Sequence, residues 1–129
     1  MSAPRIVGPD DSGVAEAAEA LAAGNLAVMP TDTVYGLAAS LAQPDAIVRI
    51  FAAKNRPENM PLPVLVASRE HAEQLVPGVL EAHEVLLERF WPGALTVIVA
   101  ASERVPVEVT AGLSTVGLRQ PDEATAQAI

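Results

Sequence analysis

The chain has 129 residues, half of them hydrophobic, and it contains no cysteine. This length suits one domain with its own core, and the lack of cysteine excludes disulfides, thiolate metal sites and a cysteine nucleophile. Sixteen acidic residues against eight basic ones give a net charge of −8, which disfavours broad binding to a phosphate backbone. Neither a signal peptide nor an apolar run of about 20 residues is recognisable, so a cytoplasmic protein without membrane attachment is expected.

Apolar spacing, prolines and turn residues divide the chain into alternating helices and strands. Helices are expected at residues 11–23, 45–53, 78–90 and from about 122, with a short one after Ser68. Strands, read as buried, are expected at residues 26–29, 62–67, 94–100 and 115–118. Asp45 and Ser68 are the expected N-caps of their helices, and Pro121 suits the first turn of the last helix. Mostly unbroken apolar strands between amphipathic helices predict an α/β sheet covered by helices.

The loop after the first predicted strand is the first candidate for a site. Thr31, Asp32, Thr33 and Tyr35 place two hydroxyls, a carboxylate and the only tyrosine within five positions. Ligand sites of open α/β sheets lie beyond strand ends, where such polar loops converge on a small molecule. The same residues also suit an ordinary turn with capping threonines, and both interpretations remain open.

A second candidate is the pair of cations at the end of the helix predicted for residues 45–53. Lys54 is the only lysine of the chain, and Arg56 follows two positions later. Lysine as a point charge and arginine through paired hydrogen bonds can together hold a triphosphate. Alternatively, both cations complement the dipole of the helix C-terminus and face water.

A third candidate is Arg119, which ends a predicted strand immediately before Gln120 and Pro121. From a strand end it can point toward the ligand of the first two segments, or it can form a surface ion pair with Asp122 or Glu123. Neither a Walker A loop nor a GxGxxG fingerprint occurs in the sequence. Trp91 is interpreted as structural. The two histidines, residues 71 and 83, are interpreted as solvated side chains and not as metal ligands.

Four segments together resemble the YrdC-like threonylcarbamoyl-AMP synthase family. They are PTDTVYGLAAS at 30–40, KNRPENMPLPVLV at 54–66, FWPGALTVIVA at 90–100 and STVGLRQPD at 114–122, in the order of that family. The resemblance implies a single domain over residues 1–129 with the YrdC-like (DHBP synthase-like) fold, a twisted mixed open sheet flanked by helices with one concave face as the site. The family carries a polar or basic residue at the position of Met60. It also continues beyond Ile129 into a strand and a Ser-Ala-Asn segment, so the domain is expected to be truncated at its C-terminus.

The resemblance implies a nucleotidyltransferase, an L-threonylcarbamoyladenylate synthase. It would form threonylcarbamoyl-AMP and pyrophosphate from L-threonine, bicarbonate and ATP, for the t6A37 modification of tRNA. The substrate-binding residues implied are Thr31, Asp32, Thr33, Tyr35 and Arg119. The nucleotide-binding residues implied are Lys54, Arg56, Thr115 and Arg119, of which Lys54 and Arg56 would also act in catalysis.

The magnesium ion implied by the resemblance would enter with ATP and would be held chiefly by phosphate oxygens and water. No metal site made of protein ligands is therefore expected, and Asp32 is the only acidic residue of the motifs expected near the ion. Other proteins of the t6A pathway are expected partners, whereas the acidic composition argues against direct tRNA binding.

Three other functions remain as alternatives. The first is a non-catalytic, truncated YrdC-like domain with weak nucleotide or RNA binding. The second is an RNA-binding module, against which the acidic composition argues. The third is the related carbamoyl-transfer domain of hydrogenase maturation proteins, whose long chains carry cysteine-rich zinc modules that this sequence lacks.

Overall fold

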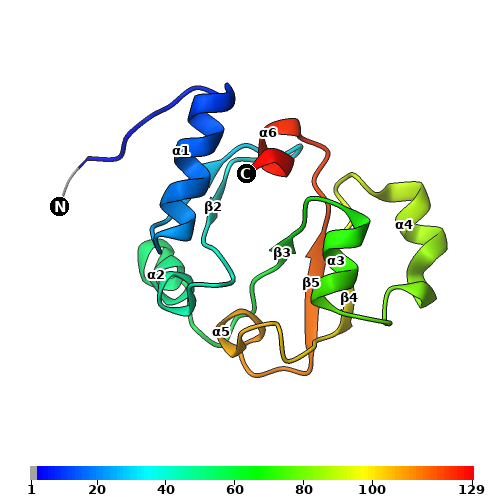
Figure 1. Cartoon of the computed structure of the whole chain (residues 1–129). Helices are drawn as coiled ribbons and strands as arrows, with labels where there is room; N and C mark the ends of the chain where they lie inside the picture. The colour runs from blue at the N-terminus through cyan, green and yellow to red at the C-terminus, as the bar shows by residue number, and fades with distance from the viewer. Residues whose placement is uncertain (1–2) are drawn as a thin grey trace.

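The computed structural model describes residues 3–129 as a mixed α/β fold (Figure 1). The helices are α1 (Asp11–Ala22), α2 (Pro44–Lys54), α3 (Arg69–Leu75), η1 (Glu81–His83), α4 (Glu84–Phe90), α5 (Val107–Thr110) and α6 (Ala124–Ala128). The strands are β1 (Ala27–Met29), β2 (Gly36–Ala38), β3 (Val64–Leu65), β4 (Val97–Ala100) and β5 (Thr115–Arg119). None of the helices formed by residues 3–129 has the length and apolar character that a membrane span requires.

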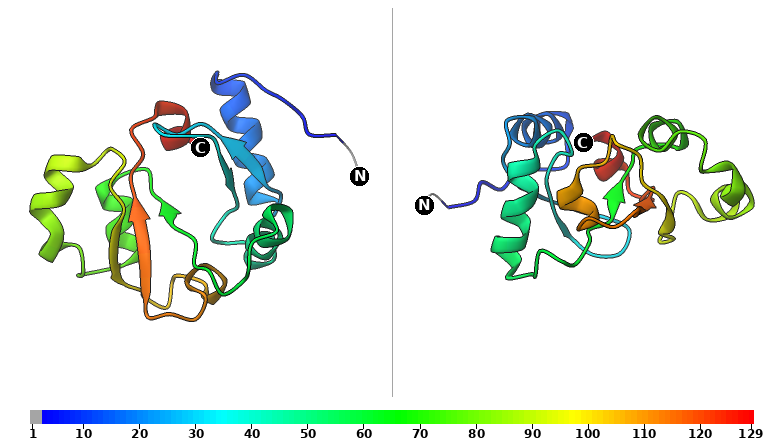
Figure 2. Two further views of the ribbon diagram at one scale, coloured as in Figure 1. Left: turned by 180° about the vertical axis from the view of Figure 1, so that it is seen from behind. Right: turned by 90° about the horizontal axis from the view of Figure 1, so that it is seen from below.

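The strands of residues 3–129 form two small sheets and not one continuous sheet. Strands β1 and β2 pair antiparallel, and the second sheet has the order β3-β5-β4, with β3 parallel and β4 antiparallel to β5. The hairpin lies with α1 and α2 on one side of the molecule, and the three-stranded sheet lies with α3 and α4 on the other (Figures 1 and 2). The α/β class and the mixed strand pairing are confirmed. Strand β2 was not predicted, because its three residues include a glycine and an alanine and form no apolar run.

The three-stranded sheet is buried on one face only, so the expectation of strands buried on both faces is wrong. Val97 and Val99 of β4 are buried, whereas Ile98 between them is 68% exposed. In β5 the side chains of Val116 and Leu118 are buried, and Thr115 is exposed. Since neighbouring residues of a strand point to opposite faces, the sheet has a core face and an open face.

The core face of the sheet joins most elements of the chain into one hydrophobic cluster. The cluster contains Ile47, Phe51, Val64, Val66, Ala72, Val76, Leu80, Leu87, Trp91, Val97, Val99, Val105, Val109, Val116 and Leu118. These residues come from α2, α3, α4, α5 and all three strands of the larger sheet, together with the loops between them. The open face of the sheet contributes none of its side chains to the cluster.

Some helices begin and end where the predicted capping residues place them, and others do not. The Ser68 hydroxyl caps α3 by accepting a hydrogen bond from the backbone N–H of His71 at 3.0 Å, as expected. Asp45 is not an N-cap, because α2 begins one residue earlier at Pro44, whose fixed φ suits a first helical position. The segment expected as one helix at residues 78–90 is divided into η1 and α4.

The last helix begins later than expected. Glu123 caps α6, and its carboxylate accepts a hydrogen bond from the backbone N–H of Ala126 at 2.7 Å. Pro121 therefore precedes the helix and does not lie in its first turn. Helix α5 was not expected at all, since its four residues are too few to display a helical period.

Candidate functional site

The loop between β1 and β2 is folded by the hydroxyl of Thr31. Its Oγ1 accepts hydrogen bonds from the backbone N–H groups of Thr33 and Val34, both at 3.2 Å, and donates to the carbonyl of Val34. The hydroxyls of Thr31 and Thr33 also lie 3.1 Å apart. Thr31 therefore acts as the capping threonine of a turn, and this turn presents Asp32 and Thr33 to the rest of the molecule.

Arg119, at the end of β5, joins this loop to the larger sheet. Its Nη1 donates to the hydroxyl of Thr33 at 3.3 Å, and its Nη2 forms an ion pair with the carboxylate of Asp32. The Nε of Arg119 donates to the carbonyl of Gly93 at 2.9 Å. The alternative that Arg119 pairs with Asp122 or Glu123 is wrong, because its carboxylate partner comes from the opposite layer of the fold.

The guanidinium of Arg119 forms a shielded ion pair. Its side chain is 12% exposed and that of Asp32 is 17% exposed, so the pair is largely shielded from water. A planar guanidinium binds carboxylates and phosphates through two parallel N–H groups, and shielding strengthens such charge-assisted bonds. In this structure the anion that the Arg119 guanidinium binds is the carboxylate of Asp32.

Lys54 and Arg56 lie at a different place, at the C-terminal end of α2. Asn55 between them has a left-handed backbone (φ 50°), which ends the helix and lets the N–H of Arg56 bond to the carbonyl of Phe51 at 2.8 Å. Nη2 of Arg56 donates to the carbonyl of Pro61 at 2.9 Å, and its Nε is buried without a hydrogen-bond partner among the described residues. Lys54 is exposed in the last helical turn, where it also complements the helix dipole.

The register of the larger sheet separates these cations from Arg119. Strand β3 runs parallel to β5 with Leu65 beside Arg119, so the residues that precede β3 lie toward the start of β5. The N–H of Leu62 accordingly bonds to the carbonyl of Val109 in α5 at 2.9 Å. The structure therefore brings Arg119, Asp32 and Thr33 together, and no hydrogen bond or ion pair of residues 3–129 links Lys54 or Arg56 to them.

The remaining predicted residues, Thr115 and Tyr35, are both exposed. Thr115 begins β5 and is exposed, and because it is four positions before Arg119 it points to the same face. Strand geometry of about 3.3 Å per residue puts the two positions roughly 13 Å apart. Tyr35 is exposed at the end of the β1–β2 loop. No hydrogen bond of residues 3–129 joins either side chain to Arg119.

One contact of Arg119 was not predicted from the sequence, namely the carbonyl of Gly93. Nearby Trp91 was interpreted as structural, and the structure confirms this, because Trp91 is buried and donates from Nε1 to the carbonyl of Leu95 at 2.9 Å. A backbone carbonyl carries no signature in the sequence. The only indication was a glycine in a tight turn, a residue that permits close backbone approach.

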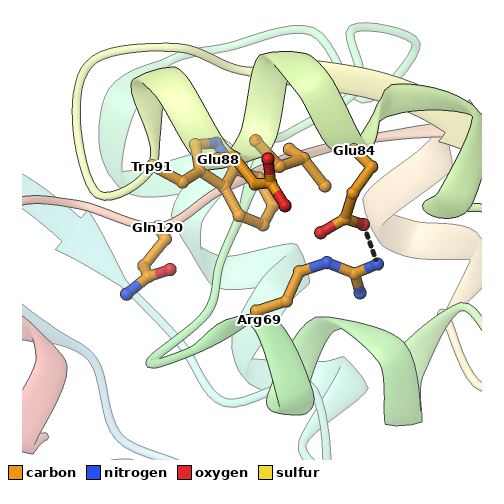
Figure 3. Close-up of a pocket in the computed structure, with 6 residues that line it drawn as sticks. Arg69, Glu84, Glu88, Trp91 and Gln120 are labelled. Carbon is orange, nitrogen blue, oxygen red and sulfur yellow. Dashed lines mark hydrogen bonds and ion pairs between the residues drawn. The ribbon is translucent and has the colours of Figure 1, made fainter.

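A separate pocket lies on the helix-covered side of the sheet, between α3 and α4 (Figure 3). It is lined by Arg69, Glu84, Leu87, Glu88, Trp91 and Gln120. Arg69 bridges Glu84 at 2.7 Å and Glu73 at 3.2 Å, and the hydrogen bond to Glu84 raises the pKa of Arg69 above its ordinary value. None of the site residues expected from the sequence lines this pocket. The described residues also contain no group of three histidine or carboxylate side chains that could hold a metal ion.

Comparison with known proteins places this geometry in context. A family model for Sua5, YciO and YrdC proteins, described as telomere recombination, matches residues 19–129. The chain belongs to the Sua5/YciO/YrdC family. The resemblance drawn from the four motif segments is thereby confirmed.

Within the Sua5/YciO/YrdC family, the threonylcarbamoyl-AMP synthase of Pyrococcus abyssi is 47% identical over 76% of this chain and 29% of its own length. The threonylcarbamoyl-AMP synthase of Bacillus subtilis is 40% identical over 93% of this chain and 35% of its own length. A crystal structure of P. abyssi Sua5 complexed with L-threonine superimposes with a TM-score of 0.87 at 41% identity, covering 92% of this chain and 35% of that one. The chain thus spans about a third of the length of these relatives.

Proposed function

We propose that this member of the Sua5/YciO/YrdC family takes part in the synthesis of threonylcarbamoyl-AMP, the precursor of the t6A37 modification of tRNA. Its substrates would be L-threonine, bicarbonate and ATP. Two relatives at 47% and 40% identity carry the name of this synthase, and a structure of P. abyssi Sua5 contains L-threonine. The observation that carries the proposal is the shielded guanidinium of Arg119, held at the open sheet face by a loop from the other layer.

The proposed reaction needs alignment and charge more than a protein nucleophile. The α-ammonium group of threonine releases a proton, and the resulting amine nitrogen bonds to the carbon of bicarbonate while water leaves, which gives a carbamate. A carbamate oxygen then bonds to the α-phosphorus of ATP while the bond to pyrophosphate breaks. Because the nucleophile belongs to the substrate, the protein has to hold the reactants together and stabilise the charge on the phosphates.

The residues at the open face suit these two tasks. Arg119 would bind a phosphate or carboxylate in place of Asp32, with the hydroxyl of Thr33 beside it. Thr31 would keep the loop in shape, and Tyr35 and Thr115 would line the surface on which the substrates lie. Lys54 and Arg56 would supply positive charge from the end of α2, so an extended nucleotide would lie along β3 and β5 between the two groups of cations.

Magnesium would arrive as the MgATP complex and would be held mainly by phosphate oxygens and water. Asp32 fits a subsidiary role near the ion, since a phosphate that takes over Arg119 would release its carboxylate. This assignment uses one carboxylate of the chain, which in this structure is paired with the Arg119 guanidinium.

A second candidate is a domain that binds nucleotide but does not catalyse the reaction. The observation that favours it is that no hydrogen bond or ion pair of residues 3–129 links Lys54 or Arg56 to Arg119, so the cations proposed for the phosphates are not joined into one site. The two candidates differ in turnover and agree in ATP binding, so one experiment separates them.

The test uses the purified chain with ATP, magnesium, bicarbonate and L-threonine, each omitted in turn. Release of pyrophosphate that requires threonine, together with threonylcarbamoyl-AMP detected by mass spectrometry, would support the synthase. ATP binding by calorimetry without threonine-dependent pyrophosphate would support the second candidate. Absence of ATP binding at millimolar concentration would overturn both.

A further inference from the structure

The backbone carbonyl of Gly93 accepts a hydrogen bond from the side chain of Arg119. We infer that Gly93 is a positioning residue, whose carbonyl fixes the orientation of the Arg119 guanidinium so that its two Nη groups face the anion site. The contact itself is a 2.9 Å hydrogen bond from Nε to the Gly93 carbonyl. That the anion is a phosphate of ATP rests on the proposed function. That Gly93 orients Arg119 does not depend on the proposed function.

The geometry of the guanidinium explains why a bond to Nε matters. Arginine has a long, flexible side chain, but its guanidinium is planar and its N–H groups point in fixed directions. An acceptor on Nε therefore sets the direction of both Nη groups at once. In this structure the two Nη groups point to Thr33 and Asp32. A ligand anion would bind to these same two Nη groups.

Gly93 holds the end of β5 by two bonds, which makes it a rigid reference point. Its own N–H donates to the carbonyl of Gln120 at 2.9 Å, so it binds the main chain next to Arg119 as well as the Arg119 side chain. The turn that carries Gly93 is in turn fixed by buried Trp91, whose N–H bonds to the carbonyl of Leu87 at 2.9 Å. The carbonyl of Gly93 is thus positioned by the core and not by the loop at the site.

The position requires glycine for a steric reason. A Cβ built on Gly93 would lie 2.4 Å from the carbonyl oxygen of Phe90, a distance that real Cβ atoms do not adopt. The obstructing atom belongs to the backbone, so a larger residue would displace the turn and its carbonyl. Gly93→Ala should therefore disturb Arg119 without removing any charge.

A double-mutant cycle on ATP affinity tests this inference, with Gly93→Ala, Arg119→Lys and the combined variant. Bonds to charged groups are strong enough that each single change should weaken ATP binding about tenfold. If Gly93 acts through Arg119, the double variant should bind no more weakly than the weaker single variant. Losses that add up would overturn the inference, as would unchanged affinity in Gly93→Ala.

The matched control is Gly13→Ala at the start of α1, where an added Cβ would also collide with backbone, 1.8 Å from the carbonyl oxygen of Gly8. It should leave ATP affinity unchanged, because it removes glycine from an equally tight place away from Arg119. An equal loss of affinity in Gly13→Ala would mean that any backbone collision weakens binding, which would contradict a specific role of Gly93.

A second measurement needs no ligand and no Gly93 variant. In the NMR spectrum of the wild-type protein, the Arg119 Nε–H should exchange with water at least about tenfold more slowly than that of exposed Arg89, because a hydrogen bond protects it. Equal exchange rates would overturn the inference. A protected Nε–H in a protein that does not bind ATP would leave the inference standing and would count against the proposed function alone.

Discussion

The two faces of the three-stranded sheet differ in what they contribute to the molecule. On the core face, Val116 and Leu118 of β5 are buried in the main cluster. On the open face, Thr115 and Arg119 of the same strand are directed toward the proposed site. Stability and recognition therefore alternate along one strand, residue by residue. Substitutions one position apart should affect one property and spare the other.

The largest expected effect is on the core face. Leu118 is 0% exposed, so Leu118→Ala should lower the free energy of unfolding by about 3 kcal/mol, the usual loss for a buried leucine whose cavity only partly collapses. Denaturant unfolding followed by circular dichroism measures this loss. Leu113→Ala is the control, since Leu113 is 56% exposed and its truncation should change stability by no more than about 0.5 kcal/mol. Similar losses in the two variants would show that burial does not decide the cost of truncating a leucine in this protein.

The next effect is on ATP binding and concerns the cations away from the sheet. Lys54→Ala and Arg56→Ala should each weaken ATP binding about tenfold, because each removes a charge proposed to contact phosphate. Neither substitution should unfold the protein, since both residues lie outside the hydrophobic cluster. Titration calorimetry at fixed salt measures the affinity.

The control for these cations is Arg89→Ala, which removes an exposed charge from α4, where the guanidinium lies over the ring of Phe90. Its ATP affinity should equal that of the wild type. If Lys54→Ala and Arg56→Ala behave like Arg89→Ala, recognition is confined to the Arg119 end of the open face, and the proposed position of the nucleotide along β3 and β5 is wrong.

Local signals in the sequence were sufficient for part of this fold. The helix expected at residues 11–23 appears as α1, because its apolar period and Gly24, whose backbone is left-handed, are local features. The strand end at Arg119 was also predicted, since an apolar run followed by a proline marks it. What the sequence did not reveal was exposure. Val97, Ile98 and Val99 are all apolar, so their alternation between core and open face is invisible until the neighbouring elements are known.

For the candidate site, the sequence identified the residues but not their roles. The residue types of the β1–β2 loop and of Arg119 identified the candidates, and the structure joins them across 87 positions of sequence. The roles were less accessible, because Thr31 folds the loop while Asp32 and Thr33 reach Arg119. The Gly93 carbonyl was beyond prediction, since the recognition of a backbone atom depends on the path of the chain and not on the residue type.

The last prediction compares the stability of two variants at neighbouring residues of β4, which lie on opposite faces of the sheet. Ile98→Thr and Val99→Thr both introduce a β-branched residue that suits a strand, so strand propensity is nearly constant. Ile98 faces the open side, and its replacement should change the free energy of unfolding by no more than about 0.5 kcal/mol. Val99 is buried, and the new hydroxyl beside apolar neighbours should cost about 1–3 kcal/mol. Because the two variants place the same threonine side chain on opposite faces of β4, equal losses of stability would mean that the open face is covered in solution, and the site proposed on it would then be inaccessible.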